Sequence, residues 1–122
     1  METTKFFGKW YGTEFENCGG ITSKQYEKFQ TDYKTTLREI CKNINFELVS
    51  FNKNHYQFSA VLRSNETGNY FYISIPDVRS WKNEWANNIL YRTMKHEKDW
   101  TGGINRYCTI VQLQSALKSL DI

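Results

Sequence analysis

Cysteine, proline and long apolar runs are all scarce in this chain of 122 residues. The three cysteines (Cys18, Cys41 and Cys108) are odd in number and widely spaced, which favours reduced thiols over a disulfide framework. A single proline excludes proline-rich linker sequences. No apolar run approaches the roughly 20 residues of a membrane span, and the first residues lack the apolar stretch of a signal peptide. We therefore expect a cytoplasmic protein, formed as one domain over residues 1–122, with no membrane partner.

Metal-binding and hydrolase motifs are also missing. His55 and His96 stand in no spacing typical of zinc ligands, and the sequence contains neither a nucleophile elbow nor a Walker phosphate loop. Cys18, beside two glycines, superficially resembles a thiol nucleophile, but a small thiol at a helix end is the simpler interpretation. Glu97 and Asp99 lie in a polar segment typical of solvated charges. We expect no metal, no cofactor and no catalysis, and keep a small nucleotide-processing enzyme as an alternative.

The charge balance is mildly basic and the aromatic content is high. Sixteen Lys and Arg against thirteen Asp and Glu give a net charge of +3. This charge argues against an acidic mimic of DNA, and dedicated duplex binders are usually more strongly basic, so we expect no nucleic-acid partner. Aromatic residues make up 16% of the chain.

Periodicity predicts helices near both ends of the chain. A long helix is expected over residues 22–43, with Thr22 and Gln25 as a capping box and Ile21 and Tyr26 as a hydrophobic staple. A shorter helix is expected within residues 4–15. Thr109 and Gln112 form a second capping box, which predicts a C-terminal helix.

Between these helices the period changes to two, which is typical of strands. We expect four strands with turn-forming residues or short connections between them, over residues 46–51, 56–63, 70–75 and 89–96. In the second strand, Gln57, Ser59 and Arg63 are expected on the solvent face. One helical turn is expected within residues 80–88. The sequence thus predicts an α+β fold, with an antiparallel sheet of four or slightly more strands and a long N-terminal and a C-terminal helix packed on it.

Residues 92–107 are the most informative segment for function. They are expected to form an irregular connection longer than most, and such loops often bind ligands. Arginine side chains fork onto phosphate oxygens, glycines allow close approach of backbone N–H groups, and amides recognise base edges. Trp100 or Tyr107 offers a flat face for a base. The candidate ligand-binding residues here are Arg92, Trp100, Gly102, Gly103, Asn105 and Arg106. The alternative is that Trp100 covers the edge of the core and the glycines only form a turn.

Two further pairs of aromatic residues each allow more than one interpretation. Trp10 and Tyr11 are candidates for a stacking platform, with a helical core face as the alternative. Trp81 and Trp85 are four residues apart in a polar connection, and the pattern does not decide between an interface and a lid.

In its size, its element order and the aromatic, Arg and Gly-Gly-Asn content of residues 92–107, the chain is similar to the phage anti-Thoeris sponges, the first described Thoeris anti-defence family. The resemblance covers the layout of the whole chain and assigns no individual binding residue. It implies a non-enzymatic phage or prophage protein of the host cytoplasm. Such a protein sequesters cyclic ADP-ribose isomers in pockets between subunits, and we would therefore expect a homodimer or higher homo-oligomer. The sequence leaves the exact ligand and the oligomer number open. An anti-CRISPR-like inhibitor of a host defence protein is the other alternative.

Overall fold

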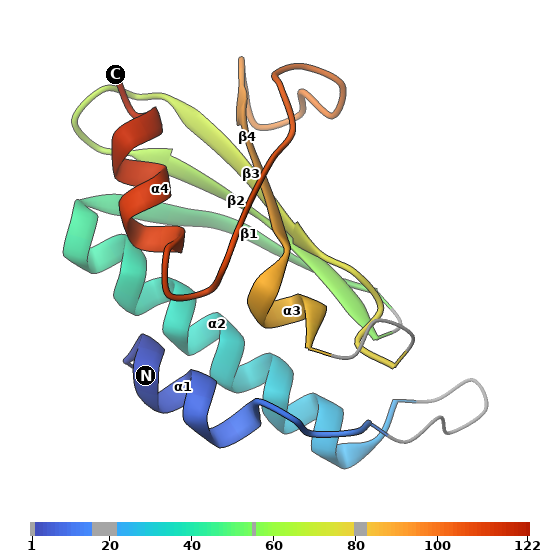
Figure 1. Ribbon diagram of the computed structural model, residues 1–122. Coiled ribbons are helices and arrows are strands. Elements are labelled where there is room, and N and C mark those ends of the chain that lie inside the picture. Colours follow the sequence, from blue (N-terminus) through green and yellow to red (C-terminus); the bar gives the residue numbers. More distant parts are fainter. Residues whose placement is uncertain (1, 16–21, 55, 80–82) are drawn as a thin grey trace.

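The computed structural model describes residues 2–15, 22–54, 56–79 and 83–122 (Figure 1). Four helices are described: α1 (Thr3–Trp10), α2 (Lys24–Ile44), α3 (Glu84–Asn87) and α4 (Leu113–Leu120). The described strands are β1 (Phe46–Asn54), β2 (Gln57–Ser64), β3 (Tyr70–Ile75), β4 (Ile89–Met94) and β5 (Arg106–Cys108).

The five strands form one antiparallel sheet in the order β1-β2-β3-β4-β5, so each strand pairs with its neighbours in the sequence. Helices α2 and α4 cover one face of this sheet, and α1 runs beside α2 (Figure 1). The α+β fold predicted from the sequence is confirmed, with one strand more than the four that periodicity identified.

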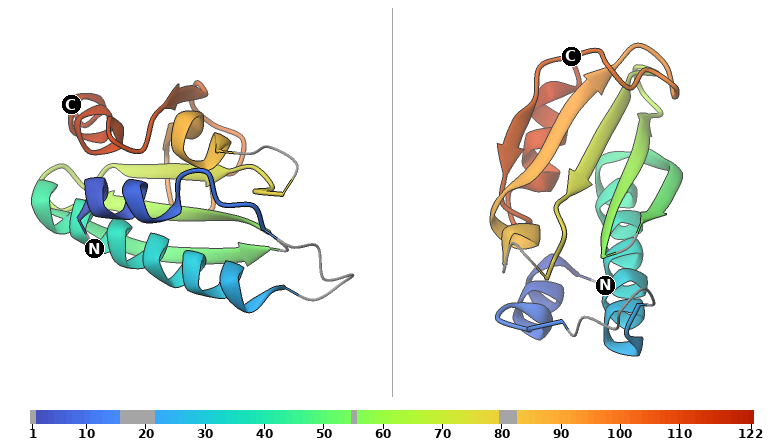
Figure 2. Two further views of the ribbon diagram at one scale, coloured as in Figure 1. Left: turned by 60° about the horizontal axis from the view of Figure 1, so that its bottom comes forward. Right: turned by 90° about the vertical axis from the view of Figure 1, so that its right-hand side faces the viewer.

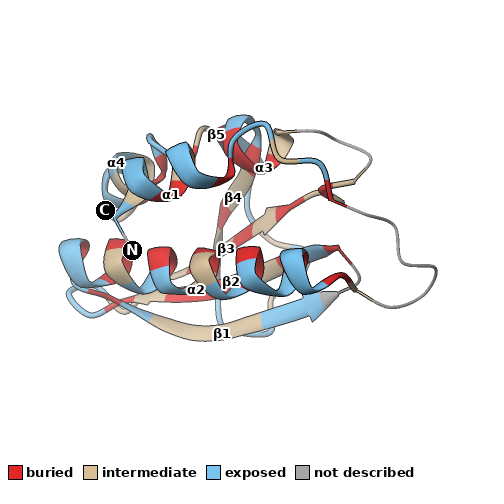
Figure 3. Cartoon of the chain, turned by 90° about the horizontal axis from the view of Figure 1, so that it is seen from below, coloured by how far each residue is buried: buried red, intermediate tan, exposed pale blue. Residues whose placement is uncertain are grey.

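The core lies between the helices and the sheet and is rich in aromatic rings. The apolar stripe predicted for the long helix supplies Phe29, Tyr33 and Leu37, all fully buried. Phe6 of α1 lies 5.2 Å from the ring of Tyr33, and Trp85 of α3 lies 5.1 Å from that of Phe29, measured between ring centroids. Buried residues recur along α2 at helical spacing (Figure 3). Trp85, which the sequence left between an interface and a lid, is therefore a core residue.

The starts and ends of the helices differ from the predictions. Ser23, and not Thr22, caps α2, because the Ser23 hydroxyl accepts a hydrogen bond of 3.1 Å from the Tyr26 N–H. Ile21, the other half of the expected staple, lies outside the described residues. The first helix ends at Trp10, because the backbone of Tyr11 is extended, and Gly12 follows with a φ of +84°.

The expected irregular segment within residues 92–107 is present over residues 95–105, but it connects two strands and not a strand and a helix. Strand β4 ends at Met94, not at His96, and residues 106–108 return to pair with it as β5. A strand of three residues is too short to produce a periodic pattern, which explains why the sequence did not indicate it. The reciprocal bonds of the second capping box are present: Thr109 N–H donates to Gln112 Oε1 at 3.1 Å, and Gln112 N–H donates to Thr109 Oγ1 at 3.2 Å. They close the turn before α4 and do not cap the helix itself, which begins at Leu113 after the N-cap residue Gln112.

The segment between β4 and β5, residues 95–105, is called here the β4–β5 loop. It projects from the end of the sheet that lies away from α1, as both Figure 1 and the right-hand view of Figure 2 show. No helix in the described part of the chain has the length and apolar character needed to cross a membrane.

Candidate functional site

The face of the sheet opposite the helices carries a row of four residues from four strands. Ser59 pairs with Ser74, Ser74 with Leu90, and Leu90 with Tyr107. Their sequence neighbours in the strands, such as Ala60 and Ile73, belong to the helix-covered core. Because alternate residues of a strand point to opposite faces, the row lies on the uncovered face.

The next row on this face contains Tyr72 and Arg92, which pair across β3 and β4. Serine side chains are small, whereas tyrosine and arginine side chains are large. Over β2 and β3, the Ser59–Tyr107 row is therefore lower than the row that contains Tyr72 and Arg92. Two adjoining depressions result, and they share Tyr72, Ser74 and Leu90. We call the two together the trough.

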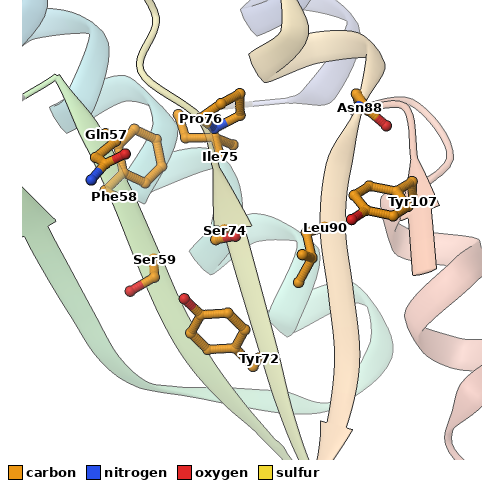
Figure 4. Close-up of a pocket in the computed structure, with 10 residues that line it drawn as sticks. All are labelled: Gln57, Phe58, Ser59, Tyr72, Ser74, Ile75, Pro76, Asn88, Leu90 and Tyr107. Atoms are coloured by element: carbon orange, nitrogen blue, oxygen red, sulfur yellow. The ribbon is translucent and has the colours of Figure 1, made fainter. Parts of the chain in front are cut away.

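The first depression of the trough has a volume of about 320 Å³. Figure 4 shows Ser59, Ser74 and Leu90 on three neighbouring strands, with Tyr72 on one side and Tyr107 beside Leu90. Gln57, Pro76 and Asn88 contribute to its rim at the other end. Its polar groups are hydroxyls and amides, which both donate and accept hydrogen bonds.

The second depression, of about 270 Å³, lies against the β4–β5 loop. Its remaining lining residues are Arg92, Trp100 and Asn105. The Trp100 ring meets that of Tyr72 edge to face, with 5.9 Å between centroids. Trp100 nevertheless stays 53% exposed, so much of its surface is open to contact a ligand.

Internal hydrogen bonds hold the β4–β5 loop in place. The Asp99 carboxylate accepts from the Lys95 N–H at 3.0 Å and from the Gly102 N–H at 2.9 Å. The backbone bond from Lys95 is the main reason that the pKa of Asp99 lies below its ordinary value. Gly103 has a φ of +81°, and a side chain there would collide with the Thr93 carbonyl oxygen. The two glycines therefore have structural roles, and the Gly102 N–H already has an acceptor.

Arg92 is the one charged side chain among the described residues that line the trough, and it is only 5% exposed. Its Nη1 donates to the carbonyl oxygens of Gly102 and of Asp99, the latter at 3.3 Å. Its guanidinium lies over the Tyr72 ring, 4.7 Å from the centroid. Among the described residues, no carboxylate forms an ion pair with Arg92, and Nε and Nη2 have no acceptor. A buried cation without a counter-charge is unfavourable, so this group is suited to bind an anion.

The structure brings together three of the eight predicted site residues: Arg92, Trp100 and Asn105 all line the second depression. Arg106 does not join them. Arg106 pairs with Tyr91, the neighbour of Arg92 in β4, and therefore faces the other side of the sheet. There it lines a separate depression beside the C-terminus. The two arginines therefore do not form one anion site.

The predicted platform of Trp10 and Tyr11 lies at the opposite end of the molecule from the β4–β5 loop (Figures 1 and 2). Trp10 is buried, and its Nε1 donates to Asp32 at 2.9 Å. Tyr11 is exposed and stacks on Phe7 with 4.6 Å between ring centroids. These contacts favour the core interpretation for Trp10.

Sequence reasoning did not single out Tyr72, which both depressions share, nor the small serines that form the floor. In a strand whose residues alternate between two faces, these residues produce the same sequence pattern as any other solvent-facing residue. The local signal that could have found Tyr72 is the run of three aromatic residues, Tyr70, Phe71 and Tyr72, in one predicted strand.

The two cysteines in the described chain, Cys41 and Cys108, are buried free thiols. Burial raises the pKa of the Cys41 thiol to about 12 and that of Cys108 to about 11, so both are protonated at neutral pH. In the part of the chain that the structure describes, His, Cys, Asp and Glu side chains form no cluster of three or more able to hold a metal ion. Cys18 and Trp81, considered from the sequence, lie outside the described residues.

Comparison with known proteins adds no relative. No family model, curated protein or solved structure matches this chain.

Proposed function

We propose that the trough binds a nucleotide without converting it chemically. The observation that carries the proposal is the buried guanidinium of Arg92, which lines an open depression and has no carboxylate partner among the described residues. A phosphate group would supply the missing counter-charge through charge-assisted hydrogen bonds. Trp100 and Tyr72 offer ring faces to a base, and the Asn105 amide offers both a donor and an acceptor to its edge.

The chemistry of the lining residues supports binding rather than turnover. Among the described residues that line the two depressions, none carries a carboxylate, a thiol, an imidazole or a lysine amine. The groups that most often act as general bases are therefore not among the described residues that line the trough. The hydroxyls of Ser59 and Ser74 have no histidine beside them among these residues, so they are not activated as nucleophiles.

The resemblance to the anti-Thoeris sponges gives the proposal a specific ligand. We propose a phage protein of the host cytoplasm that sequesters a cyclic ADP-ribose isomer, whose adenine and phosphates match the aromatic rings and Arg92. Tight sites bury most of the surface of a small ligand, whereas the trough is open on one side. A second copy of the chain lying over the trough would complete the enclosure, so we expect a homo-oligomer whose size changes with ligand, measurable by analytical ultracentrifugation.

Calorimetric titration tests the proposal. Wild-type protein is titrated with cyclic ADP-ribose isomers, with AMP, and with adenosine, which lacks the phosphate. We expect the phosphate-bearing compounds to bind more tightly than adenosine. Trp100→Ala should weaken binding about 5- to 150-fold, the range for loss of one stacked base. Arg106→Ala, an exposed arginine on the other face, is the matched control and should change affinity less than about 2-fold. Equal affinity for AMP and adenosine, or unchanged binding by Trp100→Ala, would contradict the proposal.

A further inference from the structure

The trough is larger than one nucleotide unit needs, and its two depressions differ in chemistry. The depression beside the β4–β5 loop contains the cation and Trp100, while the other contains hydroxyls, amides and Tyr107. Each has a volume near the lower end of the range for small-molecule sites, about 300 Å³. Each is therefore suited to one ring-bearing unit and not to two.

The two depressions adjoin. Tyr72, Ser74 and Leu90 line both, so no ridge of other residues separates them. The shared floor has Ser74 and Leu90 side by side, as a cross-strand pair of β3 and β4 (Figure 4). A ligand that enters one depression can extend into the other along this pair.

The far depression has its own features for a flat polar ring. Tyr107 is 56% exposed and stands beside Leu90, so its ring is accessible to stacking from the trough. Gln57 and Asn88 lie on the rim, and amide side chains can pair with the edge of a base. Since the described residues that line this depression are all uncharged, the second unit is expected to enter it as a neutral base or sugar.

From this arrangement we infer that the trough binds a ligand of the dinucleotide class, in which one unit lies at Arg92 and Trp100 and the second unit lies against Tyr107. The inference rests on the proposed nucleotide site and specifies its substrate class. Among the described lining residues there is one cation, Arg92, so a ligand whose units are joined by a single phosphate or a single diphosphate fits the trough better than a long polyanion.

The test compares AMP with a linear diadenylate, two adenosines joined by one phosphodiester, by calorimetric titration of three proteins. On wild type, the diadenylate should bind at least about 10-fold more tightly than AMP, because the second unit binds as a tethered group. Tyr107→Ala should abolish this advantage and leave AMP binding unchanged. Tyr11→Ala is the matched control, since Tyr11 is 47% exposed at the far end of the molecule, and it should behave like wild type.

The outcomes separate the two proposals. If AMP binds and the diadenylate binds no more tightly, the two-unit ligand is wrong and the nucleotide site stands. If Tyr107→Ala keeps the full advantage of the diadenylate, the second unit lies elsewhere and the inference is overturned. If neither compound binds wild-type protein, both proposals fail. Unchanged melting temperatures of the two variants show that any difference comes from the site and not from folding.

Discussion

The Arg92 guanidinium lies 4.7 Å from the centroid of the Tyr72 ring, and the two residues are a cross-strand pair of β3 and β4. This contact holds the cation flat under the β4–β5 loop, where two loop carbonyls accept hydrogen bonds from it. The charge is thus oriented and desolvated without being neutralised by a carboxylate of the described chain.

Arg92→Met tests whether that charge has a binding role. Replacing a buried charge with an apolar side chain of similar length removes a desolvation cost while it loses two hydrogen bonds. We expect the free energy of unfolding to change by no more than about 1 kcal/mol, measured by urea denaturation, while affinity for AMP falls about 10-fold or more. A loss of more than about 3 kcal/mol with unchanged AMP affinity would make Arg92 a purely structural residue.

Asp99→Ala should open the β4–β5 loop. The carboxylate accepts the N–H groups of Lys95 and Gly102, so their amide hydrogens should exchange faster in the variant while those of β3 keep their protection. NMR-detected hydrogen exchange measures both.

The same contact predicts a dependence on pH. The pKa of Asp99 is lowered in the folded protein, so closure of the loop is present above the ordinary aspartate pKa and is lost as pH falls through the folded value, below about 4. Asp99→Ala should remove this acid dependence of the loop protection factors, which are exchange rates corrected for their intrinsic dependence on pH. Wild-type loop protection factors that stay constant while Asp99 becomes protonated would contradict the role of the carboxylate.

Ser23→Ala should cost about 0.5–2 kcal/mol of unfolding free energy, because it leaves the Tyr26 N–H without its capping acceptor. Thr22→Ala is the control, since Thr22 was the cap expected from the sequence and, among the described residues, its hydroxyl donates to the exposed Glu27 side chain at 3.4 Å and to no helix backbone group. Chemical denaturation compares the two variants. If Thr22→Ala costs more than Ser23→Ala, the helix starts where the sequence alone placed it.

Leu37→Asp should destabilise the protein by at least about 4 kcal/mol, since it places a carboxylate in the fully buried stripe of α2. Thr35→Asp introduces the same charge at an exposed position of the same helix and should cost less than about 1 kcal/mol. Thermal denaturation followed by circular dichroism distinguishes them. Two equal melting temperatures would mean that the stripe does not face the core.

Long periodic segments were predictable from the sequence, and short or nonlocal features were not. The stripe through Phe29, Tyr33 and Leu37 repeats often enough to identify α2, and residues 70–75 coincide with β3. Ser23 and Thr22 have equal capping chemistry, so choosing between them needs the backbone geometry.

The candidate site shows the same limit. Arg92, Trp100 and Asn105 could be identified because they are unusual side chains in one segment. Arg106 belongs to the same segment, but strand alternation turns it to the other face, and only the pairing with Tyr91 reveals this. Tyr72 and Ser59 come from other strands and join the trough through cross-strand pairing, which local sequence patterns do not specify.

Side-chain NMR during titration with AMP tests the central claim most directly. The account predicts that the Trp100 indole N–H and the Arg92 Nε–H resonances shift with one common binding curve, while the indole N–H of Trp10, bonded to Asp32 at the far end of the molecule, does not move. Saturable shifts at Trp10 with none at Trp100 and Arg92, or no shift at any of the three, would contradict the assignment of the trough as the binding site.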